Sequence, residues 1–306
     1  MGNSLSQIKV QLVLPQEKVT FKVKLKGLWQ LIRADKPIGI LLLLWPALWA
    51  LWIAGNGNPN WYVTLVFVMG TILMRSAGCA INDYADRLID GRVSRTCQRP
   101  IATGVVKPKE ALLVFALLSL IAFALVMTLN LSTILMSFIA VILAAIYPFM
   151  KRHTYFPQVF LGAAFGWAVP MAFTAIQDSV SLVTWVLFSV TLIWALIYDT
   201  EYAIVDREDD IKIGVKSTAV LFGQFDRLII GFLQMVMLGL LVWVGELSGR
   251  SNFYLIGIVL SSSFFIRQQY LLHKHGRMGA FTAFLNNNHF GMAIFVILVI
   301  DYIITS

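Results

Sequence analysis

Apolar residues fill long stretches of this chain, and polar residues are confined to the segments between them. A membrane-spanning helix needs about 20 mostly apolar residues, whereas a barrel strand needs about 10. Only helices and closed barrels satisfy all their backbone hydrogen bonds inside a bilayer, and these stretches are too long for barrel strands. The pattern therefore predicts an all-α integral membrane protein with nine spans, at residues 38–54, 61–81, 111–129, 131–149, 157–176, 182–199, 228–246, 252–272 and 284–304.

The start of the chain has a different character. The first 27 residues are polar and rich in lysine, without an apolar stretch followed by a small-residue cleavage site. We therefore expect no cleavable signal peptide. We divide the chain into a cytoplasmic arm at 1–30 and a polytopic domain at 31–306. The first span is short and contains Pro46, so it can extend back through 31–35 as a broken or tilted helix.

Composition and charge agree with a membrane protein. The chain has 306 residues, of which 13% are charged, whereas soluble domains carry about 25%. The net charge of +8 could suggest nucleic acid, but the cations are not spread over a surface. If the N-terminus is cytoplasmic, every lysine and arginine except Arg250 falls on or towards the cytoplasmic side, as the positive-inside rule requires. Nine spans then place the C-terminus outside the cytoplasm, and we expect no nucleic-acid partner.

The two cysteines of the chain fall on the same side. Cys79 and Cys97 would both face a reducing compartment, so we expect free thiols. No histidine lies at ligand spacing from them, which argues against a zinc site.

Two long polar segments on the cytoplasmic side carry most of the acids. The first contains INDYADRLID at 81–90 and the second VDREDDIKIG at 205–214. The loops of the opposite side are short and consist of turn residues. We therefore predict that the functional face is cytoplasmic and is capped by two acidic loops.

The two acidic segments repeat one another. Asp86, Arg87 and Asp90 recur 120 residues later as aspartate, arginine and aspartate. Four spans separate the two copies, so both copies end helices of the same direction. This pattern is typical of a parallel duplication, and it predicts a parallel four-helix pseudo-repeat.

The acids have a spacing that suits metal-assisted chemistry. Residues four apart on a helix share a face, so each segment presents a stripe of oxygen ligands if its helix continues past the membrane surface. Clustered carboxylates repel one another unless a cation binds, and Mg²⁺ prefers a few carboxylates, water and substrate phosphates. We therefore predict a Mg²⁺-bridged diphosphate between the stripes. The two stripes are Asn82, Asp86 and Asp90, and Asp199, Asp206 and Asp210.

Cations accompany these acids. Arginine and lysine can clamp the remaining phosphate oxygens. Arg75 lies inside an apolar span, where a charge is costly and usually faces an interior cavity, although it could instead snorkel to the interface. The simpler alternative is that the acids of the two stripes are solvated surface residues. Their spacing and their repetition argue against that alternative. The interleaved cations are Arg87, Arg95, Arg99, Lys212 and Lys216.

At this point the sequence resembles a known family. NDYADRLID and DREDD fit the two acidic signatures of the UbiA superfamily of intramembrane prenyltransferases. Further stretches resemble its subfamily of bacterial 4-hydroxybenzoate polyprenyltransferases, which serve ubiquinone biosynthesis. The resemblance covers residues from about 33 to 291, in RADKPIGILLLLWPALWAL, RSAGCAINDYADR, RPIATG, YPFMKRHTYFPQVFLGAAFGW, YDTEYAIVDREDDIKIGVKSTAVLFG and FLNNNH.

The resemblance implies nine helices around a central cavity that opens to membrane lipid, in the bacterial inner membrane. It implies an enzyme that uses Mg²⁺ and a polyprenyl diphosphate and that prenylates 4-hydroxybenzoate ortho to its hydroxyl. Alternatives are a family member acting on a naphthoate, homogentisate or haem, and an ion-coupled transporter. A transporter should carry its acids near the bilayer midplane, whereas these acids cluster at one face.

Carried over residue by residue, the resemblance assigns roles to the candidates. The metal ligands would be Asn82, Asp86, Asp90, Asp206 and Asp210. Asp83 and Asp199 would be catalytic-site residues, with Asp199 a candidate acceptor of the phenol proton. Placement alone suggests two further groups. Arg99, Lys216 and Arg87 would bind the diphosphate, and Arg75, Lys151 and Arg152 are the candidates for the acceptor carboxylate.

Overall fold

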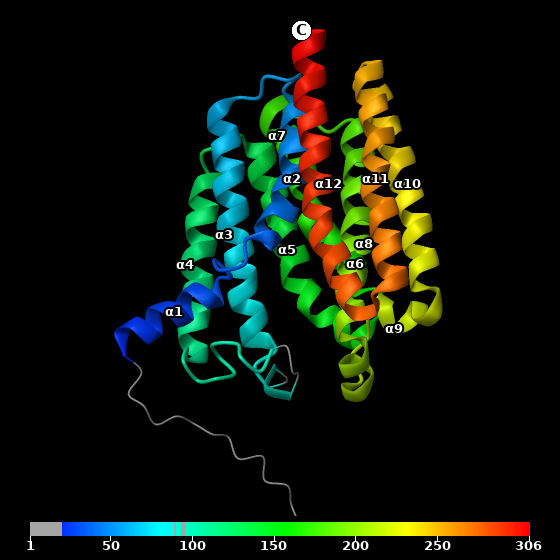
Figure 1. Cartoon of the computed structure of the whole chain (residues 1–306). Helices are drawn as coiled ribbons and strands as arrows, with labels where there is room; N and C mark the ends of the chain where they lie inside the picture. The colour runs from blue at the N-terminus through cyan, green and yellow to red at the C-terminus, as the bar shows by residue number, and fades with distance from the viewer. Residues whose placement is uncertain (1–19, 89, 93–95) are drawn as a thin grey trace, which may run out of the picture.

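The computed structural model describes residues 20–306 except 89 and 93–95, and every regular element in that part of the chain is a helix. Of the α-helices of the described residues, all but α1 and α9 run roughly along one common direction. They form an elongated bundle (Figure 1). They are α2 (Ile38–Ala54), α3 (Trp61–Ala85), α4 (Pro108–Val126), α5 (Leu131–His153), α6 (Pro157–Gly166), α7 (Ala168–Gln177), α8 (Leu182–Ile213), α10 (Asp226–Leu247), α11 (Asn252–Lys274) and α12 (Gly276–Thr305).

The helices of the bundle follow the predicted spans. Eight segments of the described chain are long and apolar enough to cross a membrane, and α2 is a shorter apolar helix of 17 residues. These segments coincide with the nine predicted spans, so the all-α membrane architecture is confirmed. The number of nine crossings stays a prediction, because α2 is short for a span.

One predicted span is built from two helices. α6 ends at Gly166 and α7 begins at Ala168. Pro170 has no N–H to bond the carbonyl of Gly166, and its ring crowds that carbonyl. The break at this point therefore has a local cause in the sequence.

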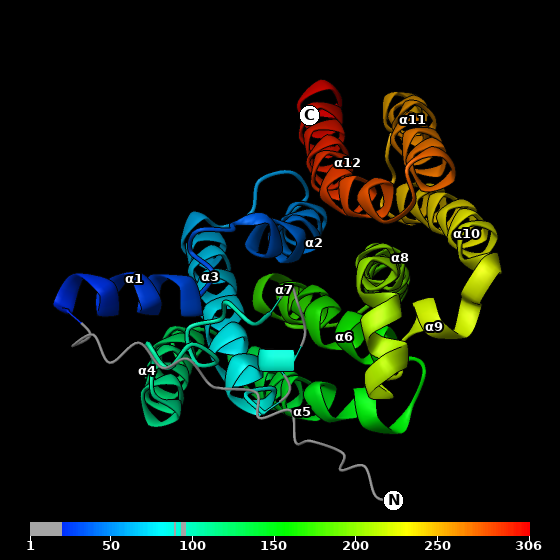
Figure 2. The ribbon, with the colours of Figure 1, turned by 60° about the horizontal axis from the view of Figure 1, so that its bottom comes forward.

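The apolar core joins the two halves of the bundle. α8 packs against α6, α10 and α12, and α2 packs against α3, α7 and α12. Trp49 of α2 stacks on Trp194 of α8 with ring centroids 5.2 Å apart, and both side chains are fully buried. Figure 2 shows α2 next to α3 and α12, and α8 next to α6 and α10.

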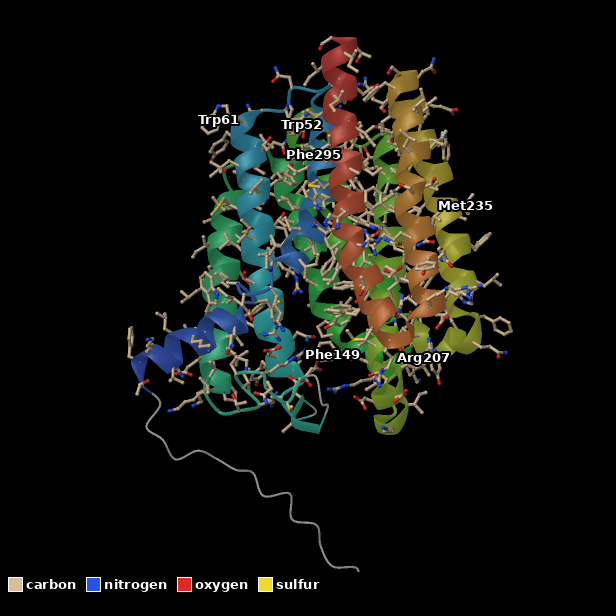
Figure 3. All side chains as sticks on the ribbon, viewed as in Figure 1. Trp52, Trp61, Phe149, Arg207, Met235 and Phe295 are labelled. Carbon is tan, nitrogen blue, oxygen red and sulfur yellow. The ribbon has the colours of Figure 1, made fainter. Side chains whose placement is uncertain are left out.

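The outer surface of the bundle is apolar, as contact with lipid requires. In each of α4 and α5, only 11% of the most apolar 18-residue stretch is buried inside the protein. Met235 is 68% exposed and projects outward from α10 (Figure 3). Aromatic pairs such as Trp52 with Phe295, whose centroids lie 4.9 Å apart, are found towards the end where Trp61 begins α3 (Figure 3).

The predicted arm contains a helix that sequence analysis did not anticipate. α1 (Phe21–Leu31) is capped by Thr20 and lies across the direction of the bundle (Figures 1 and 2). It extends beyond the boundary that we drew at residue 30. After it the chain turns through Arg33, which has a φ of 57°, and α2 begins at Ile38. Of the two predicted possibilities for residues 31–35, the broken helix is the one found, because the chain turns between α1 and α2.

A small second cluster of buried residues fixes the polar segment after α3. Leu31 of α1, Ala80 of α3 and Ala111 of α4 pack with Ile101 and Val106. The segment between α3 and α4 is thereby held against three helices, next to the first acidic motif.

The acidic motifs end up at the same end of the bundle, and the C-terminus lies at the opposite end (Figure 1). α3 and α8 run in the same direction, as the predicted parallel repeat requires. The two motifs nevertheless differ in structure. The first follows the end of α3 at Ala85, whereas α8 continues to Ile213. The second motif therefore lies on a helix and not in the predicted cap loop. The remaining short elements are η1 (Asp90–Arg92), α9 (Thr218–Phe222) and η2 (Gly223–Phe225).

The central cavity stays a prediction. Two pockets of the described residues lie at the edge of the bundle, one beside α1 and α4 and the other between α8, α10 and the turn before α12.

Candidate active site

One guanidinium gathers the carboxylates of the first acidic motif. Nη1 of Arg99 lies 3.0 and 2.9 Å from the two carboxylate oxygens of Asp90, and 3.2 Å from Oδ1 of Asp83. It lies 4.0 Å from Oδ2 of Asp86. Arg99 therefore compensates the charge of three acids from the motif, which could not otherwise lie so close together.

Asp83 is the most buried of these acids. Its side chain is 1% exposed, and its Oδ1 accepts a hydrogen bond of 2.7 Å from Nη2 of Arg33. The buried Oδ2 has no hydrogen-bond partner in the structure. A buried oxygen without a partner costs free energy, so this atom is a candidate ligand for a cation.

The predicted stripe of the first motif is interrupted. α3 ends at Ala85, and the backbone N–H of Asp86 bonds to the carbonyl of Asn82 at 2.9 Å as its cap. Asp90 opens a short 3₁₀ helix, although its N–H still bonds to the carbonyl of Asp86 at 2.9 Å. Its carboxylate meets Arg99 and is not aligned along a continuing helix. Burial raises the pKa of Asp90, and Arg99 offsets part of that rise.

The second motif lies on a continuous helix, as its predicted stripe requires. Asp199, Asp206 and Asp210 all lie on α8, which is one continuous helix. Their spacing of seven and four residues puts them on one face. All three are half-buried, and each takes part in a polar interaction.

Other charges of the second motif tie α8 to its neighbours. Arg207 pairs with Asp226 at the start of α10. Glu208 pairs with Arg277 of α12 at 3.1 Å, and Arg277 also donates to the backbone carbonyl of Val205. Figure 3 shows Arg207 at the end of the bundle that carries the motifs. The sequence alone indicates that Glu208 and Asp226 are solvated surface acids. Glu208 is indeed exposed, although paired, whereas Asp226 is largely covered by its contact with Arg207.

The acids fit Mg²⁺ by donor type but are not gathered into a finished cage. No group of three or more His, Cys, Asp or Glu residues among those described is arranged to hold a metal ion. Mg²⁺ keeps several waters and usually binds one or two carboxylates together with substrate phosphates. Amide and carboxylate oxygens from α3 and α8, including the unpartnered Oδ2 of Asp83, are suitable donors for that mode of binding.

Arg87 follows the end of α3, and its side chain is folded back onto that end. Its Nη1 donates to the carbonyl of Tyr84 at 2.7 Å, and its guanidinium lies 4.2 Å from the centre of the Tyr84 ring. These contacts hold it next to the first motif.

Lys216 brings the segment after α8 to the end of α5. Its Nζ donates to the carbonyl of His153 at 3.4 Å and lies 5.4 Å from the ring centre of Tyr155. Arg152 is exposed beside this contact. The side chain of Lys151 lies outside the described residues, as does Arg95.

Arg75 occupies the interior of the bundle. It donates to the sulfur of Cys79, and its buried Nε has no hydrogen-bond partner. The guanidinium packs on Gly39 of α2, where an added Cβ would lie 2.6 Å from Nε. Arg75 and Asp199 both lie close enough to Tyr198 of α8 to act on it electrostatically. An anionic group placed between α2, α3 and α8 would meet this guanidinium.

Sequence reasoning missed Arg33. Its position before the first span indicates an interfacial anchor, whereas the structure pairs it with Asp83, 50 residues away along the chain. No spacing rule connects residues so far apart.

A second group that sequence reasoning left without a role is the asparagine run within FLNNNH. The side chain of Asn286 accepts from Gln268 of α11, and that of Asn288 accepts from Trp45 of α2. Asn287 accepts from Trp194 and donates to the fully buried Glu201, both on α8. The stretch therefore connects α12 to three helices, including the one that carries the second motif.

The class of this protein follows from these features. It is a helical membrane protein whose two acidic motifs, with their arginine partners, lie at the same end of the bundle. The profile of the UbiA prenyltransferase family matches residues 43–294. The chain belongs to this family.

Curated relatives are similar over nearly the whole chain. A protein of Pseudoalteromonas atlantica is 56% identical over 270 residues, which cover 88% of this chain and 95% of the relative. A protein of Cronobacter sakazakii is 54% identical over 280 residues, which cover 92% of this chain and 97% of the relative. Both are named 4-hydroxybenzoate octaprenyltransferase.

Solved structures share the fold. A UbiA homologue of Aeropyrum pernix in its apo form has a TM-score of 0.73 and 23% identity, covering 87% of this chain and 97% of its own. A UbiA homologue of Archaeoglobus fulgidus, bound to GPP and Mg²⁺, has a TM-score of 0.67 and 17% identity, covering 89% and 99%.

Proposed function

We propose that this chain transfers the polyprenyl group of a polyprenyl diphosphate to the ring carbon ortho to the hydroxyl of 4-hydroxybenzoate. The product is 3-polyprenyl-4-hydroxybenzoate, for ubiquinone biosynthesis. The observation that carries the proposal is the identity of 54% and more with proteins named 4-hydroxybenzoate octaprenyltransferase over about nine tenths of the chain. An octaprenyl diphosphate is therefore the first donor to test.

The acidic motifs would hold the donor by its diphosphate. Mg²⁺, which a UbiA homologue binds together with GPP, would neutralise the charge of the leaving group when bound. The unpartnered Oδ2 of Asp83 supports a cation site here, and Asp83 would also position Arg33 and Arg99. The residues that would hold the metal are Asn82, Asp86, Asp90, Asp206 and Asp210.

The cations around the motifs would stabilise the departing diphosphate. Negative charge collects on its oxygens as the allylic carbon–oxygen bond breaks, and donors fixed in advance lower the cost of that charge. Arg99, Lys216 and Arg87 would supply these donors. Arg99 would then exchange part of its contact with Asp90 for the diphosphate, because one guanidinium cannot serve both fully.

The acceptor would lie deeper in the bundle. Arg75 is the first candidate for the carboxylate of 4-hydroxybenzoate, because its buried Nε has no partner. Arg152 and Lys151 are the others. The ring carbon attacks the allylic cation and then loses its own proton, which the departed diphosphate can accept, so that the ring regains its aromaticity. A dry interior protects the allylic cation from water. Asp199, which lies next to Tyr198 on α8, would accept the phenol proton and return it when the ring regains its aromaticity.

The protein is a multi-pass membrane protein, with its predicted place in the bacterial inner membrane. Our proposal for its orientation puts the acidic end of the bundle and the N-terminus in the cytoplasm and the C-terminus in the periplasm. The distribution of lysine and arginine supports this orientation.

The test is an assay on membranes that carry the protein. They are incubated with 4-hydroxybenzoate and octaprenyl diphosphate, with Mg²⁺ or with EDTA, and the prenylated acid is measured by mass spectrometry. We expect product only with Mg²⁺, and a loss of at least about 100-fold in Asp86→Ala and Asp206→Ala. Asp178→Asn is the matched control, because Asp178 is an exposed acid in the loop before α8.

The outcomes separate the parts of the proposal. Prenylation of another aromatic acceptor alone would contradict the choice of substrate and leave the mechanism standing. Full activity of both alanine variants would contradict the metal site. If Asp199→Asn kept full turnover at every pH, its role as proton acceptor would be wrong.

A further inference from the structure

α1 is fixed to the bundle by one face. Lys24 donates to the carbonyl of Val105 at 3.1 Å and pairs with Glu110 at the start of α4. Gly27 packs so closely on Val105 that an added Cβ would lie 2.6 Å from that side chain. Leu31 is fully buried. The orientation of the helix is therefore set by contacts and not by chance.

The opposite face of α1 is apolar and uncovered. Phe21 is 84% exposed, Leu25 58% and Trp29 56%. Their spacing of four residues puts them on one stripe. No described part of the chain covers this stripe. Such a large apolar stripe on a helix that lies across a membrane bundle is unfavourable in water.

Two lysines border the apolar stripe. Lys22 and Lys26 follow Phe21 and Leu25 around the helix, and both are exposed. Neither forms an ion pair with a described residue. A helix with an apolar face next to a basic face is suited to the boundary between acyl chains and anionic head groups.

A cavity at the start of α1 offers room for such a head group. It has a volume of about 420 Å³ and lies between α1 and the start of α4, where Phe21, Lys24, Lys107 and Glu110 contribute to its lining. Lys24 is paired with Glu110, so the ammonium group of Lys107 is the cation of this cavity that would meet a phospholipid phosphate, while the acyl chains would pass Phe21.

We propose that α1 lies in the membrane interface and binds anionic phospholipid. The apolar stripe would enter the acyl region while Lys22, Lys26 and the cavity by Lys107 bind the phosphates. Charge favours this partner over a second copy of the chain, because a two-fold contact through this face would bring identical lysines together. The proposal concerns the attachment of α1 and does not depend on the reaction.

The test measures hydrogen exchange of residues 21–31 in the full-length protein. The protein is placed in nanodiscs of phosphatidylcholine, or of phosphatidylcholine with phosphatidylglycerol. We expect exchange about tenfold slower in the anionic discs, because each lysine near an anionic surface contributes attraction. Lys22→Gln with Lys26→Gln should abolish this difference and leave prenyl transfer in detergent unchanged. Lys109→Gln with Lys274→Gln is the matched control, since both residues are exposed lysines of other helices.

Each outcome decides the proposal. Equal exchange of wild-type α1 in the two kinds of disc would overturn the proposal, because anionic lipid would then not be what covers the stripe. An equal loss in the control pair would also overturn it, since general attraction of a basic protein would then suffice. A dimer in neutral discs that Leu25→Asp converts to a monomer would identify the second copy as the occupant.

Discussion

Replacing Arg99 by glutamine should destabilise the protein more than any other single change at the acidic end. The guanidinium is 16% exposed, and the carboxylate of Asp90 is 6% exposed. Asp83 would keep its hydrogen bond from Arg33. The carboxylate of Asp90 would lose both of the hydrogen bonds that Arg99 donates to it.

The magnitude follows from the number and burial of these contacts. Breaking a buried ion pair by removing one partner costs about 3–5 kcal/mol. The pair is not fully buried, so we expect about 3 kcal/mol for Arg99→Gln. Asp90→Asn leaves Arg99 its contact with Asp83, so about 1.5 kcal/mol is expected. Because both variants lose the same bonds, the double variant should fall short of the sum by about 1–2 kcal/mol.

The assay is unfolding of the detergent-solubilised protein by SDS, followed by circular dichroism, with EDTA present. Arg99→Lys should give an intermediate loss, because lysine keeps the charge but not the forked geometry. Arg227→Gln is the control, since Arg227 is an exposed arginine at the start of α10. If Arg99→Gln were no more harmful than Arg227→Gln, or if the two single effects simply added, Arg99 would not be the counter-ion of Asp90.

Two further predictions concern other parts of the bundle. Asp301→Asn should cost about 3 kcal/mol of stability in the same assay, because the fully buried Asp301 pairs with Arg250 at 3.3 Å. The activity of the folded protein should not change. An unchanged unfolding curve would contradict this prediction. Gly39→Ala should displace the guanidinium of Arg75 and raise the KM for 4-hydroxybenzoate about tenfold, with the KM for the donor unchanged. Gly70→Ala is its control, since a Cβ there would meet nothing within 4 Å.

The class of fold and the position of the spans could be predicted from the pattern of apolar residues alone. α2 begins and ends where the apolar run does, at Ile38 and Ala54. Apolar length is a local property, and a bilayer admits few other solutions. The sharing of one face by Asp199, Asp206 and Asp210 could also be predicted, because helical periodicity depends only on spacing along one helix.

The limits of single elements were less predictable. Sequence analysis ended the sixth span at residue 199, whereas α8 continues to Ile213. Hydropathy marks where a helix leaves the membrane and not where the helix ends. The opposite error occurred after α3, where the chain turns at Asp86 and the predicted stripe is interrupted.

The pairing of the charged side chains could not be predicted without the packed helices. Arg33, which sequence analysis took for an interfacial anchor, reaches Asp83 across 50 residues. Arg99 is shared between Asp86 and Asp90, which the resemblance assigns to a metal, and Asp83, which it assigns to the catalytic site. The stripe of α1 is visible in the sequence, but its exposure depends on the face that docks on Val105. Contacts between distant segments depend on how helices pack, and packing is set by the whole set of side chains at once and not by local spacing.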